Sequence, residues 1–320
     1  MFRKIISVVS IALALVLVQA CAPASYIVDN PTPSTLKYDA SQDASQKDVA
    51  INDKRPSDQS FSQGVLKANL TQNEQVIDPM AYLKTHTQAE LNARGVAASV
   101  VSQSDTQVDV SKLMMRNYRA NGYAPFITFT MLSADVQIDG RTERLGVYIK
   151  RGKVPVWSFT EIVQPTLNEP MDLLVKEFAA KLSSRLSGAK IADGDVQNLI
   201  SKIKADLANP LIYLDVYQLG FGNNASAIPF LVELSKSEAE YIRLAAISSL
   251  GILKAVDQLA SLQSIYTNSK VWQDRAMALK AIGDIGTQEA VNFLQTENQN
   301  LSADNSREGK WYKEVIALYI

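Results

Sequence analysis

Apolar and polar residues alternate most clearly between positions 124 and 150, where two strands are predicted. Ala124 to Ile138 is rich in Phe, Ile and Thr, and Thr142 to Lys150 returns after the pair Asp139-Gly140. That pair favours a two-residue hairpin turn, because Asp and Gly tolerate positive φ angles. Arg151-Gly152 indicates a second turn, and Val154 to Val163 a third strand. The pattern therefore predicts an antiparallel meander.

Two predicted helices flank this meander. Asp78-Pro79 marks the start of the first, because Asp caps helices and Pro fits the first turn, and Gly95 suits its end. Asn168-Glu169-Pro170 marks the start of the second. Its apolar positions form a stripe typical of a helix lying on a sheet: Met171, Leu174, Val175, Phe178 and Leu182.

Shorter apolar segments predict strands at residues 49–56, 63–70 and 96–101. The whole order predicts an α+β sheet-and-helix layer domain over residues 48–188, with two helices on one face of a mainly antiparallel sheet. This order and the strand end Asp53-Lys54-Arg55 resemble small periplasmic lipoprotein domains, namely the YajG-like lipoproteins, the outer-membrane activators of peptidoglycan synthases and the amino-terminal domain of TolB. The resemblance implies a domain that acts by binding other proteins.

After Gly188 the chain repeats itself. Leu219-Gly220, Leu250-Gly251 and Ile282-Gly283 recur at spacings of 31 and 32 residues. Apolar residues agree in phase four positions before each glycine and eight and eleven after it: Val216, Ile247 and Leu279; Ile228, Leu259 and Val291; Leu231, Leu262 and Leu294. This period predicts a helix, a glycine-bearing turn and a second helix in each repeat, hence an all-α solenoid over residues 189–320.

The repeat core Arg-(Leu/Ala)-(Ala/Met)-Ala and the Leu/Ile-Gly turn resemble HEAT-type repeats over residues 212–300. The resemblance implies an extended surface for protein partners. Lys310 to Ile320 is predicted to form the last amphipathic helix, and Asp195 to Leu207 to close the other end. Three repeats bury their apolar faces only against neighbours, so we expect the solenoid to lean on the α+β domain.

The amino-terminal segment predicts an export signal. Arg3 and Lys4 precede an apolar run from Ile5 to Val18, which is too short to span a membrane and typical of a signal-peptide core. Val18-Gln19-Ala20-Cys21 resembles the lipobox of bacterial lipoproteins. The resemblance implies removal of residues 1–20 and attachment of diacylglycerol and an N-acyl chain to Cys21. The alternative is an ordinary secretory signal with a chance cysteine.

The segment after the cysteine adds two expectations. Ala22 stands where Asp favours inner-membrane retention in that family, which implies an outer-membrane lipoprotein facing the periplasm. Residues 21–47 contain three prolines and many Ser, Asp and Gln residues but few large apolar side chains. Such composition offsets little ordering entropy by burial, so this segment is predicted to be a disordered tether.

Composition narrows the partners. Hydrophobic residues make up 47% of the chain, which suffices for buried cores. Of the 32 Lys and Arg residues, two lie in the signal, so 30 face 33 Asp and Glu, a net charge of −3. Nucleic-acid binding is therefore not expected. Cys21 is the single cysteine, so an intramolecular disulfide is impossible, and lipidation needs no partner thiol.

Catalytic chemistry has few candidates. The single histidine, His86, accompanies no distinctive nucleophile motif and favours a surface position. Asp135, Asp139 and Glu143 stand at hairpin distance and could form a hydrolase couple, although such groups are usually solvated. One histidine and one cysteine cannot form a common zinc site. No metal, cofactor or small-molecule substrate is expected.

Two short segments have alternative interpretations. Asp193-Gly194-Asp195 lacks the further ligands of a calcium loop, which favours Asp195 as a helix cap. Lys150-Arg151-Gly152-Lys153 is predicted to be a solvated basic hairpin tip, with contact to an anionic glycan or lipid headgroup as the alternative.

Aromatic and basic residues gather at the starts of the repeat helices. Tyr241, Trp272 and Trp311 favour core packing or capping, with a row of anchors for a protein partner as the alternative, since such residues dominate interface hot spots. Arg243 and Arg275 match in phase and either pair with acidic groups of the next repeat or present a charged ladder. These five residues are the candidate partner-binding set.

The sequence as a whole favours a non-enzymatic, lipid-anchored scaffold that binds periplasmic or outer-membrane proteins. A second hypothesis makes the α+β domain an activator of a peptidoglycan synthase or another envelope assembly machine. A third is a hydrolase acting on the cell wall.

Overall fold

The computed structural model describes residues 24–39, 46–65, 68–121, 123–153, 158 and 160–320. Its strands are β1 (Ala24–Ile27), β2 (Lys47–Asp53), β3 (Ser62–Gly64), β4 (Ala68–Gln72), β5 (Gln75–Val76), β6 (Ala98–Val101), β7 (Gln107–Tyr118), β8 (Phe126–Ile138) and β9 (Arg141–Lys153). The helices before the repeats are α2 (Pro79–Ala93), α3 (Thr160–Val163), the π-helical turn η1 (Gln164–Asn168) and α4 (Glu169–Ser187).

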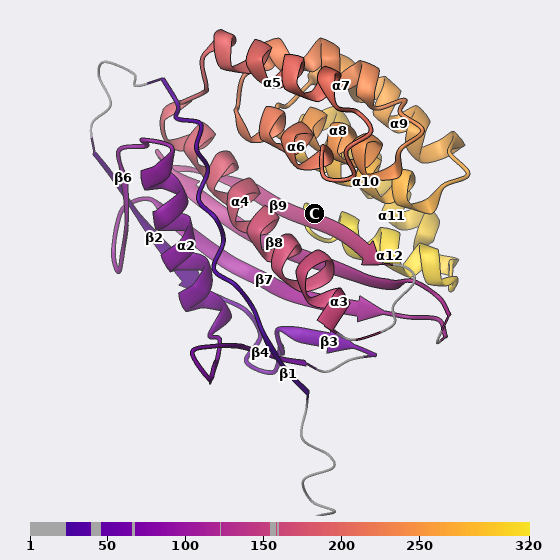
Figure 1. Ribbon diagram of the computed structural model, residues 1–320, viewed down its shortest axis with the longest axis horizontal. Coiled ribbons are helices and arrows are strands. Elements are labelled where there is room, and N and C mark those ends of the chain that lie inside the picture. The colour runs from indigo at the N-terminus through magenta and orange to yellow at the C-terminus, as the bar shows by residue number, and fades with distance from the viewer. Residues whose placement is uncertain (1–23, 40–45, 66–67, 122, 154–157, 159) are drawn as a thin grey trace, which may run out of the picture.

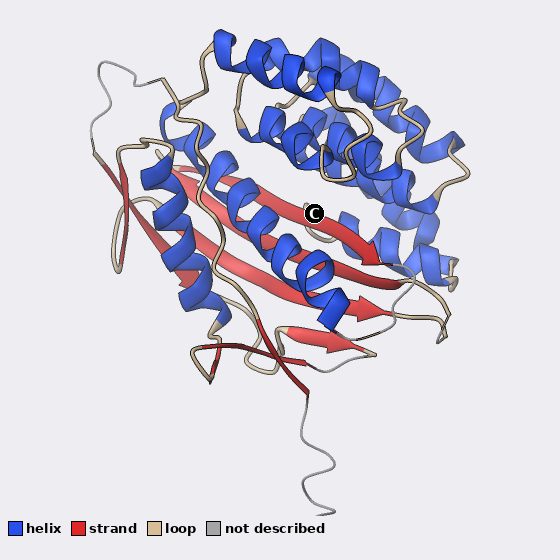
Figure 2. Cartoon of the chain, in the orientation of Figure 1, coloured by secondary structure: helices blue, strands red, loops and turns tan. Residues whose placement is uncertain are grey.

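The remaining elements are helical. They are α5 (Asp193–Ala205), α6 (Tyr213–Phe221), η2 (Ala225–Ala227), α7 (Ile228–Leu234), α8 (Glu240–Ile252), η3 (Val256–Gln258), α9 (Leu259–Asn268), α10 (Trp272–Ile285), α11 (Gln288–Asn300), η4 (Leu301–Ala303) and α12 (Arg307–Ile316). Figure 1 traces this order through the molecule, and Figure 2 separates the strands from the helices that surround them. The predicted fold class, an α+β layer domain followed by a helical solenoid, is confirmed.

The main sheet is mixed, with strand order β6-β2-β7-β8-β9 and β3 attached to β7. β2 runs parallel to β6 and β7, whereas β7, β8 and β9 form an antiparallel meander. The predicted hairpin turn is confirmed: Ile138 pairs with Arg141, and Asp139 and Gly140 have φ angles of 50° and 72°. Both central residues with positive φ match the twist of the flanking strands.

The third strand of the meander was predicted on the wrong side. It is β7, which precedes the hairpin, whereas Thr160 to Val163 forms helix α3. The alternation in β7 is interrupted by a register shift between Val110 and Lys112, which hides its period in the sequence. The predicted strand at 63–70 also divides, because β3 joins the main sheet and β4 joins a separate one.

Helices α2 and α4 cover one face of the sheet, as predicted. The side chain of Asp78 accepts hydrogen bonds from the backbone N–H groups of Met80 and Ala81, which confirms the expected cap. All five residues of the predicted apolar stripe of α4 are buried. Gly188 ends α4 in the left-handed region, with a φ angle of 64°.

The carboxyl-terminal helices cover the opposite face, so the sheet lies between two helical layers. Alternate side chains divide between the faces: Leu132 and Val147 join the core beneath α4, whereas Met131 and Tyr148 pack with α10 and α12 residues. Figure 1 shows the repeats passing the β9 edge of the sheet on their way to that second face. The expectation that the solenoid leans on the α+β domain is met by the packing of α10 against β9.

The repeats form two layers of their own. Helices α6, α8 and α10 lie between the sheet and an outer layer made of α5, α7, α9 and α11 (Figure 1). Burial follows this arrangement, because most residues of α8 and α10 are buried, whereas α9 and α11 bury few. The inner helices α8 and α10 are therefore buried nearly all round, and the outer helices α9 and α11 on one side only.

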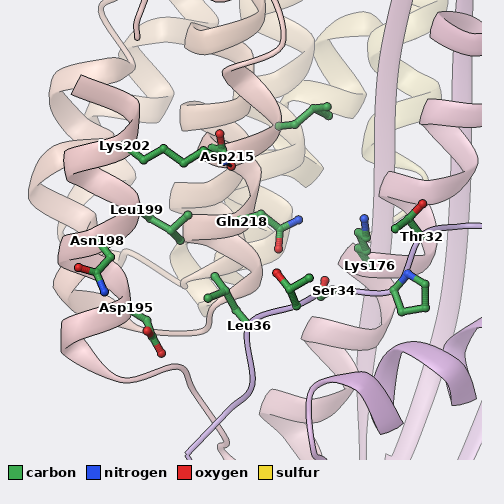
Figure 3. A pocket seen from close by; sticks show the side chains of 13 residues that line it. Thr32, Ser34, Leu36, Lys176, Asp195, Asn198, Leu199, Lys202, Asp215 and Gln218 are labelled. Carbon is green, nitrogen blue, oxygen red and sulfur yellow. Dashed lines mark hydrogen bonds and ion pairs between the residues drawn. The ribbon is translucent and has the colours of Figure 1, made fainter. Parts of the chain in front are cut away.

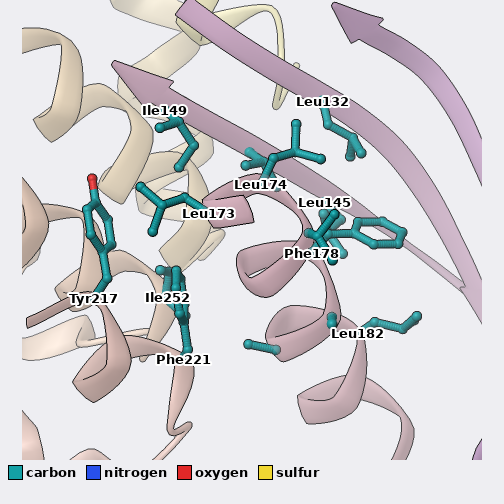
Figure 4. Close-up of a cluster of buried hydrophobic side chains, with 14 of the residues drawn as sticks. Leu132, Leu145, Ile149, Leu173, Leu174, Phe178, Leu182, Tyr217, Phe221 and Ile252 are labelled. Carbon is teal, nitrogen blue, oxygen red and sulfur yellow. The ribbon is translucent and has the colours of Figure 1, made fainter. Parts of the chain in front are cut away.

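A continuous core joins the sheet to the first repeats (Figure 4). Side chains from four elements converge there: Leu132, Leu145 and Ile149 of the sheet, Leu173, Leu174, Phe178 and Leu182 of α4, Tyr217 and Phe221 of α6, and Ile252 of α8. The apolar contacts thus run across the boundary between residues 188 and 189.

The repeat pattern predicted that the aligned glycines lie in the turns between helices, and this prediction is wrong. Gly220, Gly251 and Gly283 lie inside α6, α8 and α10, at the places where each helix touches the next element. A Cβ on Gly251 would lie 2.5 Å from the Cα of Ala281. The turn residues stand three positions later, where Asn223, Lys254 and Gly286 have positive φ angles. The recurring glycine therefore sets the distance between neighbouring repeats.

The prediction of a disordered tether is wrong for residues 24–39. β1 pairs in parallel with β4, and the chain then crosses the molecule as a strap, residues 28–39, over α2, α4 and α6 (Figure 1). Val28 and Tyr38 are buried, and the Tyr38 hydroxyl donates a 2.6 Å hydrogen bond to the Phe221 carbonyl. A few well-placed side chains thus anchor a segment whose composition resembles that of a linker.

We predict that Gly251→Ala lowers the free energy of unfolding by about 1–3 kcal/mol, because the added methyl group overpacks the contact with the α10 backbone. Gly194→Ala in α5 is the matched control, since a Cβ there meets no atom within 4 Å. Helix propensity alone should make that control neutral or more stable by up to about 1 kcal/mol. Urea unfolding of both variants measures the difference, and an equal gain in both would contradict the spacing role.

Candidate functional site

The candidate partner-binding aromatic residues lie between the sheet and the repeats, where Trp311 is buried and Tyr241 and Trp272 are partly buried. The Tyr241 hydroxyl donates a 2.8 Å hydrogen bond to the Gly152 carbonyl of β9. Trp272 packs with its ring centroid 4.7 Å from that of Trp311, and both rings contact Phe129 of β8. The core-packing interpretation of these aromatic residues therefore fits the structure, because the sheet of the same chain occupies their surface.

The two phased arginines have different partners. Arg243 donates two 3.0 Å hydrogen bonds from Nε to the carboxylate of Asp274, which belongs to the next repeat. Arg275 donates a 2.8 Å hydrogen bond to the Tyr266 carbonyl, and its guanidinium lies 4.9 Å from the centre of the Tyr312 ring. Pairing with the next repeat holds for Arg243, and Arg275 instead stacks on aromatic rings.

A buried cluster of four charges joins the α+β domain to the repeats. Glu177 and Lys181 come from α4, and Lys280 and Asp284 come from α10. Each lysine contacts both carboxylates: Lys181 lies 2.5 Å from Glu177 and 2.6 Å from Asp284, and Lys280 lies 2.8 Å from each. No side chain of the four is more than 4% exposed. We call this set the charge cluster.

The surroundings of the charge cluster supply further hydrogen bonds, although the Glu177 Oε2 atom is buried without a hydrogen-bond partner. Lys181 also donates to the Gly146 carbonyl of β9 at 2.6 Å, and Lys280 donates to the Ser248 hydroxyl at 2.6 Å. The Tyr319 hydroxyl donates to Asp284 at 2.8 Å. The cluster thus connects the sheet, α4, two repeat helices and the carboxyl-terminal segment.

The ionisation of the charge cluster follows from this pairing. Burial alone would raise the pKa of Asp284, but the two lysines outweigh it and hold that pKa below its usual range. Burial alone would lower the pKa of Lys280, but Asp284 and Glu177 outweigh it and raise that pKa. At Lys181 burial outweighs the same carboxylates and lowers the pKa of that lysine. The pairing therefore favours the charged forms of Lys280 and Asp284 in particular.

A second polar set lies at the far end of β9. Arg151 forms an ion pair with Glu169 of α4 and donates a 2.7 Å hydrogen bond to the Tyr213 hydroxyl of α6. Its guanidinium lies 4.0 Å from the centre of the Tyr241 ring. Lys150 forms an ion pair with Glu240 of α8. The predicted solvated basic hairpin tip at 150–153 is therefore wrong, because these residues end β9, and Lys150 and Arg151 are buried against acidic and aromatic partners.

The strap is held in place by contacts with residues of the α2 region and of α6. Arg94, directly after α2, forms a buried ion pair with Glu90 of α2 at 2.7 Å and donates a 2.9 Å hydrogen bond to the Ser34 hydroxyl. The Glu90 carboxylate also accepts the Ser34 backbone N–H at 2.9 Å. The strap is thus held at its middle by a buried ion pair, in addition to the Tyr38 hydrogen bond at its end.

A cavity of about 470 Å³ lies between the strap, α5 and α6. Figure 3 shows Thr32, Ser34 and Leu36 on one side and the α5 and α6 side chains on the other. Both lysines of its lining have partners, since Lys202 lies 2.8 Å from Asp215 and Lys176 lies 2.8 Å from Asp172. The lining offers hydrogen-bonding groups but no nucleophile next to a base.

The residues considered for hydrolysis do not come together. Asp135 pairs with Arg144 across the hairpin, and Glu143 pairs with Arg185 of α4. Their positions one step apart in the register place the two carboxylates on opposite faces of the sheet. His86 lies on α2 with its ring centroid 4.2 Å from that of Tyr82, and burial lowers its pKa.

The remaining site predictions have simple outcomes. Helix α5 begins at Asp193, two residues before the expected cap, and the Asp193 carboxylate accepts a 2.7 Å hydrogen bond from Asn224. The described part of the chain contains no group of three or more His, Cys, Asp or Glu side chains that could hold a metal ion. Nor does it contain a helix long and apolar enough to cross a membrane. Cys21 lies outside the described residues.

Sequence reasoning missed the charge cluster and the Arg151 set. A signal was present, because Glu177 and Lys181, and Lys280 and Asp284, stand four residues apart in helices that are otherwise apolar at nearby positions. Charged pairs at that spacing usually stabilise an exposed helix face. Pairs embedded in apolar helices indicate instead that two helices meet through their charges, but the identity of the facing helix is not contained in the spacing.

Comparison with known proteins supports the repeat assignment. A family model described as HEAT repeats matches residues 216–283, which span α6 to α10. A solved structure titled "Crystal structure of uncharacterized protein" is similar over 52% of this chain and 100% of its own, with 12% sequence identity and a TM-score of 0.30. No curated protein matches this chain. The chain therefore contains HEAT-type repeats, a class that commonly serves as a scaffold for protein interactions.

We predict that Lys280→Met lowers the free energy of unfolding by about 3–5 kcal/mol, because it leaves two buried carboxylates with one lysine. Lys202→Met is the matched control, since Lys202 is 64% exposed and its pair with Asp215 should contribute less than about 1 kcal/mol. Adding Glu177→Gln to Lys280→Met should restore part of the loss by rebalancing the charge. Denaturant unfolding of the three variants tests this, and similar losses at positions 280 and 202 would contradict it.

Proposed function

We propose that this protein is a non-enzymatic scaffold of the cell envelope that binds other periplasmic or outer-membrane proteins through the outer helices of its solenoid. The observation that carries the proposal is the division of the repeats into two layers. The inner helices are covered by the sheet of the same chain, whereas α5, α7, α9 and α11 have no such cover. A partner would thus meet the outer layer.

The surface of α9 and α11 supports this choice. Their exposed side chains are uncharged apart from Glu289: Ala260, Ser261, Ser264, Thr267 and Asn268 in α9, and Gln288, Asn292, Gln295, Thr296, Asn298, Gln299 and Asn300 in α11. Charged residues are depleted at the centres of protein interfaces, because their desolvation is costly. Amide and hydroxyl groups form hydrogen bonds across an interface at a lower desolvation cost. We call this surface the polar strip.

The proposal also includes the lipid anchor. The lipobox-like sequence ending at Cys21 supports export and acylation, and the single cysteine has no other role in an exported chain. The attached acyl chains would hold the protein at the outer membrane with its folded part in the periplasm, since each buried CH₂ contributes about 0.8 kcal/mol. The proposal needs no cofactor.

The polar strip is tested by photo-crosslinking in intact cells. A crosslinking residue at Ser261 or Gln295 should yield adducts with one envelope protein, because both side chains are exposed and face outwards. The control position is Lys84, which is exposed on α2, away from the repeats. The identified protein should then bind purified Gln295→Arg protein more weakly than wild type. Adducts from position 84 alone would contradict the proposal.

The anchor is tested by labelling cells with radioactive palmitate. The wild-type protein should incorporate label and fractionate with the outer membrane, whereas Cys21→Ser should do neither, because it lacks the acceptor thiol. Ala22→Asp is a second variant, expected to keep the label and move the protein to the inner membrane. Unlabelled wild-type protein, together with unchanged fractionation of Cys21→Ser, would contradict lipidation.

A further inference from the structure

The strands β1, β4 and β5 form a small sheet whose outer face is uncovered. Its register places Ile27, Thr71 and Val76 side by side across the three strands. Ile27 and Val76 are 75% and 63% exposed, although both are large and apolar, and Thr71 between them is buried, with its hydroxyl donating a 3.3 Å hydrogen bond to the Tyr26 carbonyl. The alternate residue Leu70 points inwards and is buried in the core. The small sheet therefore has one face on the core, and two exposed apolar side chains, Ile27 and Val76, on either side of Thr71 on the other.

The described strand residues on this face are uncharged. Ser25 and Asn69 pair in the next row and complete it with a hydroxyl and an amide. Acidic and amide groups lie at its rim: Asn73 and Glu74 in the tight turn between β4 and β5, with φ angles of 49° and 65°, and Asp29 and Asn30 directly after β1. An apolar centre with a polar rim fits a lipid surface, because the side chains at the centre can enter the boundary between headgroups and acyl chains.

Because the predicted anchor at Cys21 lies close to this face in the chain, we infer that lipid covers the face. Three residue steps separate Cys21 from Ala24, where β1 begins, and they span at most about 11 Å. Acyl chains on Cys21 would therefore hold β1 within that distance of the membrane. This step rests on the lipidation that belongs to the proposed function.

The strands of the small sheet are fixed to the rest of the molecule. Val28 and Leu70 are buried in the core that the sheet and α4 share, and the Asp29 N–H donates to the Asn168 side chain at 3.1 Å. The strap beyond is held by Ser34 and Tyr38. A membrane contact at β1 therefore fixes the orientation of the whole protein.

We propose that the outer face of the β1-β4-β5 sheet lies on the membrane surface, with Ile27 and Val76 in contact with lipid. Figure 1 shows β1 and β4 at one end of the molecule and α7 and α9 at the other. This orientation directs the outer repeat helices away from the membrane, towards the aqueous compartment in which a partner approaches.

Spin labels on the full-length, lipidated protein test the proposal. Acylation occupies the single native thiol, so Ile27→Cys, Val76→Cys and the control Ser261→Cys each carry one free thiol. The proteins are bound to vesicles of phosphatidylethanolamine and phosphatidylglycerol. Labels at 27 and 76 should show a several-fold higher ratio of collisions with oxygen to collisions with a water-soluble nickel chelate than the label at 261. All three positions are exposed, so the variants should fold.

Three results would overturn the proposal, and each is distinct. Acylated, vesicle-bound protein with equal ratios at all three positions would show that the anchor holds and this face stays in water. Dipolar broadening between labels at position 27 on neighbouring copies would assign the face to a second copy of the chain. A mass spectrum without acyl groups on Cys21 would remove the anchor itself and with it the proposed lipidation.

Discussion

The buried contact between two lysines and two carboxylates, Glu177, Lys181, Lys280 and Asp284, constrains everything else in this protein. Removing four charges from water costs several kcal/mol per ion, and only close pairing with full hydrogen bonding offsets that cost. The pairing is complete only when α4 and α10 meet in one register. Apolar packing alone tolerates small shifts of one helix along another, whereas the charge cluster would lose its ion pairs if α4 and α10 shifted. The charges therefore specify how the solenoid is mounted on the sheet.

That mounting explains how so short a solenoid is stable. Each HEAT-type repeat buries its apolar surface against its neighbours, and a short array leaves inner surface uncovered. Here the sheet supplies the missing neighbour, and its aromatic side chains Phe129 and Tyr148 fill the surface beneath Trp272 and Trp311. The inner helices thus serve stability, and any recognition falls to the outer layer. Aromatic residues at repeat-helix starts, which often indicate a binding surface, here indicate an internal interface.

Local features of this protein could be predicted from its sequence, whereas contacts between residues far apart in the chain could not. The Asp139-Gly140 turn, the Asp78 cap and the phase of the repeats each depend on neighbours within about one repeat, so their patterns could be interpreted directly. Lys150 meets Glu240 across 90 residues, and Tyr38 meets Phe221 across 183. No periodicity encodes such pairs. The sequence therefore predicted that the basic segment at 150–153 and the linker-like segment before residue 47 are exposed to solvent, although distant partners bury parts of both.

The ordered strap changes what an anchor at Cys21 would do. A free coil of some 26 residues can stretch to about 85 Å, which lets a domain search for partners at variable distance from the membrane. With β1 beginning at Ala24, most of that reach is absorbed into the fold. A short link gives a fixed height and a fixed face instead, so partner geometry rather than linker length decides which complexes form. The same buried contacts that join the two domains then transmit this orientation from β1 to the outer repeat helices, because the core between them is continuous.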